Sequence, residues 1–159
     1  MVASTFGEEN IKKGDEILIT ELEHHSNYVP WHYLRETKGA IIKFAPINDD
    51  GDIIISKLKE LITSKTKIIA VTHLSNVTGT IVPIKEIVEI ARKKNIPVLV
   101  DGCQSAPHIK IDVKDLDCDF YAISGHKVYG PTGVGILYAK KKWLEKLPPY
   151  IGGGGMISE

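Results

Sequence analysis

Several features that mark specialised proteins are scarce or absent in this sequence. Only two cysteines, Cys103 and Cys118, occur among 159 residues. They lack the paired spacing of a zinc or iron-sulfur site, and two thiols cannot make a disulfide framework. Twenty basic and twenty acidic residues give zero formal charge, so no overall charge attracts the chain to nucleic acid or to an anionic membrane. These absences predict a cytoplasmic protein whose partners include neither nucleic acid nor membrane.

Long apolar runs and targeting signals are also missing. No run is long enough to span a bilayer, and residues 1–9 lack the basic region and apolar core of a signal peptide. Hydrophobic residues still make up 43% of the chain, which suffices for a real core at this length. We therefore expect one soluble globular domain over residues 1–159, with no repeat or linker that divides it.

Short apolar runs alternate with segments of helical period along the chain. The predicted strands are 16–20, 40–45, 67–72, 98–101, 120–124 and 135–140. The predicted helices are 29–36, 53–62 and 83–94. In the last of these helices the apolar residues share one face and the charged residues the other. The alternation predicts an α/β fold, with a mostly parallel sheet and helices on both faces.

Polar side chains follow three of the predicted strands where each strand ends. These residues are Asn76, Asp101, Gln104, Ser124, His126 and Lys127. Because successive parallel strands present their carboxyl ends at one edge of the sheet, we expect these side chains to lie together. In open α/β sheets that edge is where ligands bind.

Lys127 lies in a glycine-rich turn directly after an apolar run, and it is the candidate for a covalent cofactor anchor. A lysine amine forms a Schiff base readily only when desolvation or neighbouring charge favours its neutral form. Ser124 and His126 offer donors to an anionic group, and the glycines allow the backbone to approach a ligand closely. The alternative is an ordinary surface lysine.

Asp101 and His24 are the next candidates. Asp101 ends an apolar run, where burial destabilises a carboxylate unless a cation faces it. The protonated nitrogen of a pyridoxal phosphate ring is such a cation, and an aspartate that keeps it charged makes the ring an electron sink. A helix N-cap is the alternative role for Asp101. His24 is followed by His25, and adjacent side chains on a strand point in opposite directions, so at most one of them is expected to face a site.

Metal and nucleotide sites fit the sequence poorly. The histidines and Cys103 include no close pair with metal-ligand spacing on a helix. The segment 130–135 lacks the lysine and hydroxyl that follow the last glycine of a phosphate-binding loop, and a strand-like run follows it instead of a helix. We predict no metal site and disfavour a nucleotide-binding domain.

Five motifs in order resemble the large domain of SufS-type, group II cysteine desulfurases, a branch of the class V aminotransferase superfamily with pyridoxal phosphate fold type I. They are EHHSNYVPW (23–31), THLSNVTG (72–79), VDGCQ (100–104), DCDFY (117–121) and SGHKVYGPTGVG (124–135). The resemblance implies that residues 1–159 are a partial pyridoxal phosphate-binding large domain, without the N-terminal segment and the small C-terminal domain. It also implies a mixed seven-stranded sheet whose missing strand would flank 135–140.

The resemblance implies a role for each candidate residue. Lys127 matches the lysine that forms a Schiff base with pyridoxal 5'-phosphate, and Asp101 matches the partner of the pyridine nitrogen. His24 corresponds to the histidine that stacks on the ring and moves protons, so Lys127 and His24 are the implied catalytic residues. The other implied cofactor-binding residues are Gln104 and Asn76, near the phenolic oxygen and the substrate, and Ser124 and His126, at the phosphate.

The family's reaction converts L-cysteine to L-alanine and leaves the sulfur as an enzyme persulfide for iron-sulfur cluster assembly. This implies L-cysteine as substrate, a sulfur-acceptor protein as partner, and a homodimer for the full-length protein. The persulfide needs a thiolate nucleophile, which the family supplies from a cysteine in its C-terminal part. Neither Cys103 nor Cys118 matches that position, so we expect this chain to be an incomplete transferase without turnover of its own.

Two kinds of alternative remain open. The first is another class V enzyme on the same scaffold: a selenocysteine lyase, a kynureninase-like hydrolase or an aminotransferase. The second is a non-catalytic remnant that acts as a binding module. In either case an unpaired apolar strand at 135–140 would favour self-association.

Overall fold

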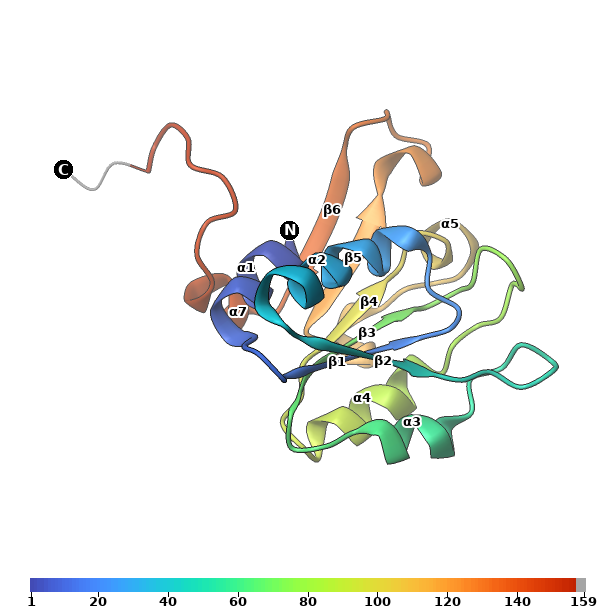
Figure 1. The fold of residues 1–159 in the computed structure, drawn as a ribbon. Coiled ribbons are helices and arrows are strands. Elements are labelled where there is room, and N and C mark those ends of the chain that lie inside the picture. The colour runs from blue at the N-terminus through green and yellow to red at the C-terminus, as the bar shows by residue number, and fades with distance from the viewer. Residues whose placement is uncertain (157–159) are drawn as a thin grey trace.

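Residues 1–156, which the computed structural model describes, build a six-stranded sheet with helices on both faces (Figure 1). The strands are β1 (Glu16–Thr20), β2 (Ile41–Ala45), β3 (Thr66–Thr72), β4 (Val98–Asp101), β5 (Phe120–Ser124) and β6 (Gly135–Ala139). Their order across the sheet is β2-β1-β3-β4-β5-β6. Each neighbouring pair is parallel except β5 and β6, which form an antiparallel hairpin. The prediction of a mostly parallel α/β sheet is confirmed.

The helices form two layers around this sheet. Figure 1 shows α1 (Val2–Asn10), α2 (Val29–Lys38) and α7 (Lys141–Lys146) on one face, and α3 (Ile55–Leu61) and α4 (Ile84–Arg92) on the other. The shorter elements are α5 (Ser105–His108), α6 (Val113–Leu116) and the 3-10 helices η1 (His25–Asn27) and η2 (Gly125–Lys127). No described helix has both the length and the apolar character that crossing a membrane requires.

The central strands are buried on both sides, which explains their continuous apolar sequences. In β1, Ile17 and Ile19 belong to the core beneath α1 and α2, whereas Leu18 belongs to the core beneath α3 and α4. All three side chains have no exposed surface. Strands covered on both faces lose the alternation of apolar and polar residues that half-buried strands show.

The predicted elements are found with small changes at their ends. The helix expected over 29–36 continues to Lys38, where Gly39 at φ +71° ends it in the left-handed conformation. The helix expected over 53–62 is shorter, because Ile53 pairs with Ile47 in an isolated bridge before α3 begins. The other bounds differ from the prediction by two residues or fewer.

Four helices were not predicted: α1, α5, α6 and α7. In α1, tertiary packing outweighs weak local preference. Phe6 packs edge-on against Phe120 and Trp143, with ring centroids 6.2 and 5.3 Å apart. At Gly7 a Cβ atom would lie 2.4 Å from Leu34 Cδ1, so the glycine lets α1 and α2 approach.

The family's seventh strand has no counterpart among residues 1–156, and β6 is an edge strand of the described sheet. Ile136, the second residue of β6, is 59% exposed. The hairpin of β5 and β6 rises away from the rest of the sheet (Figure 1). The expectation of an unpaired apolar edge therefore holds for the described part of the chain.

Candidate active site

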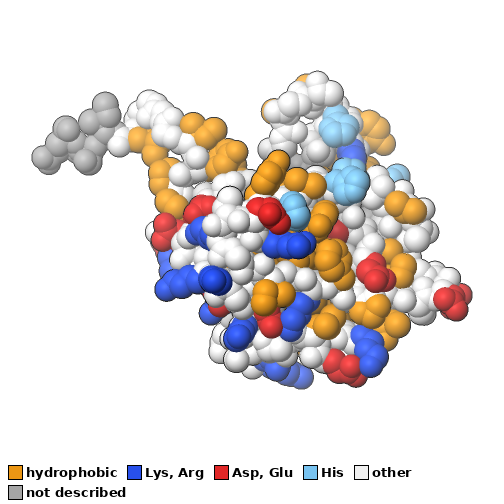
Figure 2. Space-filling view, viewed as in Figure 1, with side chains coloured by type: hydrophobic (Ala, Val, Ile, Leu, Met, Phe, Trp, Pro, Cys, Tyr) orange, Lys and Arg blue, Asp and Glu red, His pale blue; other side chains and the backbone are white. Residues whose placement is uncertain are grey.

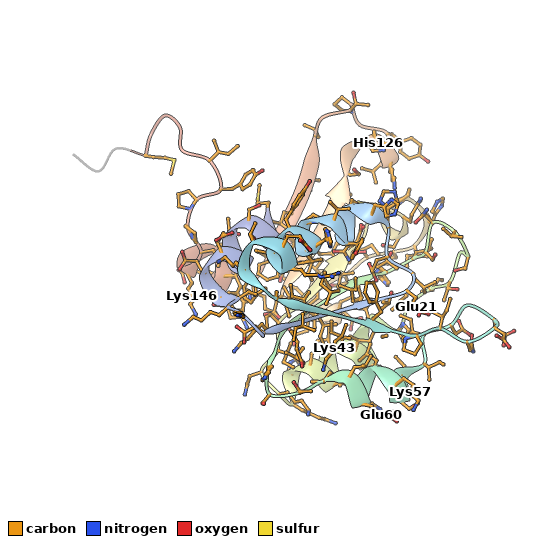
Figure 3. The ribbon with its side chains drawn as sticks, in the orientation of Figure 1. Glu21, Lys43, Lys57, Glu60, His126 and Lys146 are labelled. Atoms are coloured by element: carbon orange, nitrogen blue, oxygen red, sulfur yellow. The ribbon has the colours of Figure 1, made fainter. Side chains whose placement is uncertain are left out.

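The carboxyl ends of β3, β4 and β5 and the turn after β1 enclose a cavity of about 280 Å³ that is lined mostly by residues with polar side chains. All seven residues predicted from the sequence line this cavity: His24, Asn76, Asp101, Gln104, Ser124, His126 and Lys127. His126 lies at the outer end of β5 (Figure 3). Histidine side chains gather near this end of the molecule in the space-filling view (Figure 2). Parallel topology thus brings together side chains that are up to 103 residues apart.

The turn that carries Lys127 is compact because three backbone hydrogen bonds close it, one of them from the Gly130 amide to the Gly125 carbonyl at 2.9 Å. The Gly125 amide donates to the Val134 carbonyl at 2.9 Å, and the Val128 amide donates to the Gly125 carbonyl at 3.0 Å. A Cβ atom on Gly125 would lie 2.8 Å from the Val134 carbonyl oxygen, so only glycine fits without a shift of the backbone. The hairpin therefore fixes Lys127 at the end of β5.

Asp101 is the last residue of β4 and is 9% exposed. Its Oδ1 atom accepts a hydrogen bond from the Cys103 amide at 2.9 Å, which leaves Oδ2 for another partner. The N-cap of α5 is Gln104, and it makes no side-chain cap bond. The alternative role of Asp101 as a helix N-cap is therefore wrong, and its carboxylate closes the turn before α5 instead.

A buried network of side-chain hydrogen bonds lies next to the turn that follows β4. Tyr121 Oη pairs with His73 Nδ1 at 2.9 Å and with Ser105 Oγ at 2.6 Å. Burial raises the pKa of Tyr121 to about 12, so the phenol stays protonated at neutral pH. A Cβ atom on Gly102 would lie 1.9 Å from Tyr121 Cε1. Glycine therefore lets the backbone after Asp101 pass over the ring.

His24 precedes the 3-10 helix η1 and caps it. Its Nδ1 atom accepts from the Ser26 amide at 3.2 Å and pairs with Ser26 Oγ at 2.8 Å. Because Nδ1 acts as the acceptor, the neutral ring carries its proton on Nε2. His24 lines the cavity and His25 does not. The two histidines lie at a turn and not on a strand, so only one faces the site, as expected, but not because of strand alternation.

Five of the seven side chains have no polar group that is engaged by another residue among 1–156. Within the described part of the chain, the side chains of Asn76, Gln104, Ser124, His126 and Lys127 make no hydrogen bond or ion pair with the protein. Their amides, hydroxyl, imidazole and amine are therefore available to a ligand. A cluster of this kind is typical of a preformed binding site.

The two cysteines are poor nucleophiles. Burial, followed by the nearby Asp101 carboxylate, raises the pKa of the Cys103 thiol to about 11. Burial raises the pKa of the Cys118 thiol to about 11 as well. Both thiols stay protonated at neutral pH, whereas the thiolate is the reactive form.

Four other residues line the cavity without having been predicted: Ser26, Thr72, Leu74 and Cys103. Ser26 and Thr72 lie within the motifs EHHSNYVPW and THLSNVTG, so position next to a motif residue was the available signal.

Among residues 1–156 no group of three His, Cys, Asp or Glu side chains is placed to hold a metal ion. His73 is 7% exposed and pairs with Tyr121.

A larger cavity of about 410 Å³ adjoins the site and shares Ser26, Asp101, Cys103 and Ser124 with it. The rest of its wall is mostly apolar and comes from α1, α2 and the β5–β6 hairpin. It contains no lysine or histidine. The reactive side chains therefore face the smaller cavity, which is the candidate active site.

Comparison with known proteins identifies the family to which the chain belongs. The aminotransferase class V family model matches residues 1–159. A probable cysteine desulfurase of Halalkalibacterium halodurans is 53% identical over 157 residues, which cover 99% of this chain and 39% of that protein. The chain thus spans about 39% of the length of the curated relatives it matches.

Two solved structures resemble the fold closely. The crystal structure of the cysteine desulfurase CsdA from Escherichia coli, in an S-sulfonic acid form, superposes with a TM-score of 0.95 at 42% identity, over 100% of this chain and 40% of that one. A mutant of C-DES with glycine covalently linked to its pyridoxal phosphate cofactor superposes with a TM-score of 0.81 at 33% identity, over 90% and 39%.

Proposed function

Because this chain belongs to the aminotransferase class V family, we propose that it is the central part of the large domain of a SufS-type, group II cysteine desulfurase. In this proposal the complete enzyme converts L-cysteine to L-alanine and passes the sulfur, by way of an enzyme persulfide, to an acceptor protein for iron-sulfur cluster assembly. Identity near 50% to cysteine desulfurases supports the reaction. The complete enzyme acts as a homodimer.

The observation that carries the proposal is the set of uncommitted polar groups around Lys127. The lining of the cavity offers an amine, a buried carboxylate, two imidazoles and several neutral donors. These groups fit pyridoxal 5'-phosphate, which presents an aldehyde, a pyridine nitrogen, a phenolic oxygen and a phosphate. The C-DES structure holds the same cofactor on a similar fold.

Each residue has a distinct role in this proposal. The Lys127 amine is the covalent anchor, and Asp101 holds the positive charge of the pyridine nitrogen. His24 covers the ring and exchanges protons through Nε2. Gln104 and Asn76 bind the phenolic oxygen and the substrate, while Ser124 and His126 donate hydrogen bonds to the phosphate.

When bound, the cofactor supplies an electron sink that stabilises negative charge at the substrate Cα. Lys127, whose amine would hold the cofactor, would also be the base for the substrate Cα proton. Sulfur transfer requires a thiolate. The raised pKa values of Cys103 and Cys118 argue against either thiol. The nucleophile therefore comes from another part of the enzyme.

Titration with pyridoxal 5'-phosphate tests the proposal. We expect the purified protein to develop the visible absorbance band of a Schiff base, and borohydride to fix the cofactor on the peptide that contains Lys127. The variant Lys127→Ala should show neither result. Lys141→Ala, which removes an exposed lysine of α7, should behave as the parent. Folded parent protein with no band, or with label spread over surface lysines, would contradict the assignment.

A further inference from the structure

Glu23 lies directly behind the cavity wall, and its carboxylate joins three segments of the chain. Oε1 accepts from Thr20 Oγ1 at 2.6 Å and from the Thr72 amide at 2.9 Å. Oε2 accepts from Asn27 Nδ2 at 2.6 Å. One side chain therefore ties the end of β1, the end of β3 and the 3-10 helix η1 together.

The contact with Thr72 has a clear origin in the sheet. The β1–β3 ladder pairs Ile19 with Ala70, and β1 ends at Thr20. The amide of Thr72 therefore has no strand partner on that side, and the Glu23 carboxylate replaces the missing carbonyl. Buried amides left without an acceptor are costly, so this bond holds the end of β3 in place.

The contact with Asn27 continues into the site. Asn27 is 5% exposed and belongs to η1, the helix that His24 caps. Its Oδ1 atom accepts from the Trp31 indole at 3.5 Å. With the indole fixing its oxygen, Asn27 presents its NH₂ group to Glu23. The two sides of the cavity that carry His24 and Thr72 thus meet at one carboxylate.

We propose that Glu23 is a positioning residue, whose ionised carboxylate fixes the η1 turn and thereby holds the His24 ring over the cofactor site. The proposal rests on the assignment of the cavity to pyridoxal phosphate. Glu23 does not line the cavity, so it acts through His24 and not on the ligand.

All three partners of Glu23 are donors, so position 23 needs a side chain with two acceptor oxygens, and a group of the same shape that carries a donor does not suffice. A protonated carboxyl or an amide would turn a donor toward Asn27 Nδ2. Burial raises the pKa of Glu23 to about 7, and the negative charge of the neighbouring Asp101 carboxylate adds to this effect. Thr20, Asn27 and the Thr72 amide are neutral donors that act in the opposite direction.

A charge swap tests this role. Glu23→Gln places an amide donor against Asn27. The double variant Glu23→Gln with Asn27→Asp restores the pairing, because the introduced carboxylate accepts from both the introduced amide and the Trp31 indole. Glu21→Gln is the matched control, since Glu21 is exposed, contacts the Ile47 amide and lies apart from His126 (Figure 3).

The first measurement needs no cofactor. In the cofactor-free protein at pH 8, the ¹⁵N shifts of His24 should show a single tautomer with the proton on Nε2. Glu23→Gln should give averaged shifts, and the double variant should recover the parent pattern. Parent-like shifts in folded Glu23→Gln would overturn the proposal.

The second measurement is affinity for pyridoxal 5'-phosphate, read from Schiff-base absorbance. Glu23→Gln should weaken binding about tenfold, and the double variant should recover most of that loss. Unchanged affinity in Glu23→Gln, or no recovery in the double variant, would contradict the positioning role. Failure of the parent to bind the cofactor would instead count against the proposed function, while the histidine shifts still decide the role of Glu23.

Discussion

The carboxylates of Asp101 and Glu23 lie near one another but in different surroundings. Asp101 lines the cavity and accepts one amide through Oδ1, so its second oxygen remains available to a ligand. Glu23 is enclosed by three donors and does not line the cavity. The first is placed for contact with a cofactor and the second for holding the backbone. Residue type alone does not distinguish these two roles.

The raised pKa of Glu23 predicts a pH dependence of stability. Glutamate has an ordinary pKa of 4.5, and burial raises that of Glu23 to about 7 in the folded state. Between about pH 4.5 and about pH 7 the folded protein therefore holds a proton that the unfolded chain has released. The free energy of unfolding should fall as pH rises through this window, by at most about 1.4 kcal/mol per pH unit from this group.

Urea unfolding at several pH values measures this effect. The difference in unfolding free energy between the parent and Glu23→Gln should change with pH across the window and level off above it. Subtraction removes the opposite contribution of His73, whose pKa burial lowers. A difference that is constant from pH 4.5 to pH 8 would show that Glu23 titrates normally.

At the scale of elements, the site depends on two turns that follow strands and pack closely against neighbouring groups. The turn from β4 to α5 passes over the ring of Tyr121, and the η2 turn passes under the Val134 carbonyl. Glycines at 102 and 125 make both approaches possible. Close backbone packing therefore positions the elements that carry Asp101 and Lys127, and the bond from the Cys103 amide to Asp101 Oδ1 adds to it at the first turn.

Gly102→Ala tests this dependence on close approach. The added methyl would lie 1.9 Å from a ring carbon of Tyr121, whose hydroxyl is held by His73 and Ser105. We expect a loss of about 3 kcal/mol in unfolding free energy and weaker cofactor binding. Gly153→Ala, where no atom lies within 4 Å, should be neutral in the same denaturation assay. Equal stability of the two variants would disprove the packing argument.

At the scale of the whole molecule, the sheet has a buried centre and an exposed apolar edge. The inner strands β1, β3 and β4 are covered on both faces, whereas Ile136 in β6 is 59% exposed and Val134 is 55% exposed. Among the described residues, β6 pairs with β5 alone. Unpaired edges with apolar side chains are templates for pairing with another chain.

Residues 1–159 should therefore self-associate, and Ile136→Lys should reduce that association. A charge on the edge strand opposes pairing with a second copy. Sedimentation velocity over a range of concentrations measures the effect, with Ile136→Val as the apolar control. Monomeric behaviour of the parent at every concentration, or association of Ile136→Lys equal to that of the parent, would rule out this edge as the contact.

The strands and the amphipathic helices were predictable because their patterns are local. Burial of β1 is indicated by its three consecutive apolar residues, and burial of one face of α4 by its helical period of apolar residues. Helix α1 was missed because its stability comes from Phe120 and Trp143, which are more than 100 residues away. The position of Glu23 was missed for the same reason, since Thr72 is 49 residues from it.

The sequence by itself determined the six strands, the three helices α2, α3 and α4, the residues at the strand ends and the motifs of the family. Only the tertiary structure decided that seven of those residues line one cavity, that Asp101 closes a turn and does not cap α5, and that a carboxylate outside the cavity holds its wall. The physical reason is that hydrophobic patterns act between near neighbours along the chain, whereas hydrogen-bond partners and close approaches depend on which segments the packed sheet brings together.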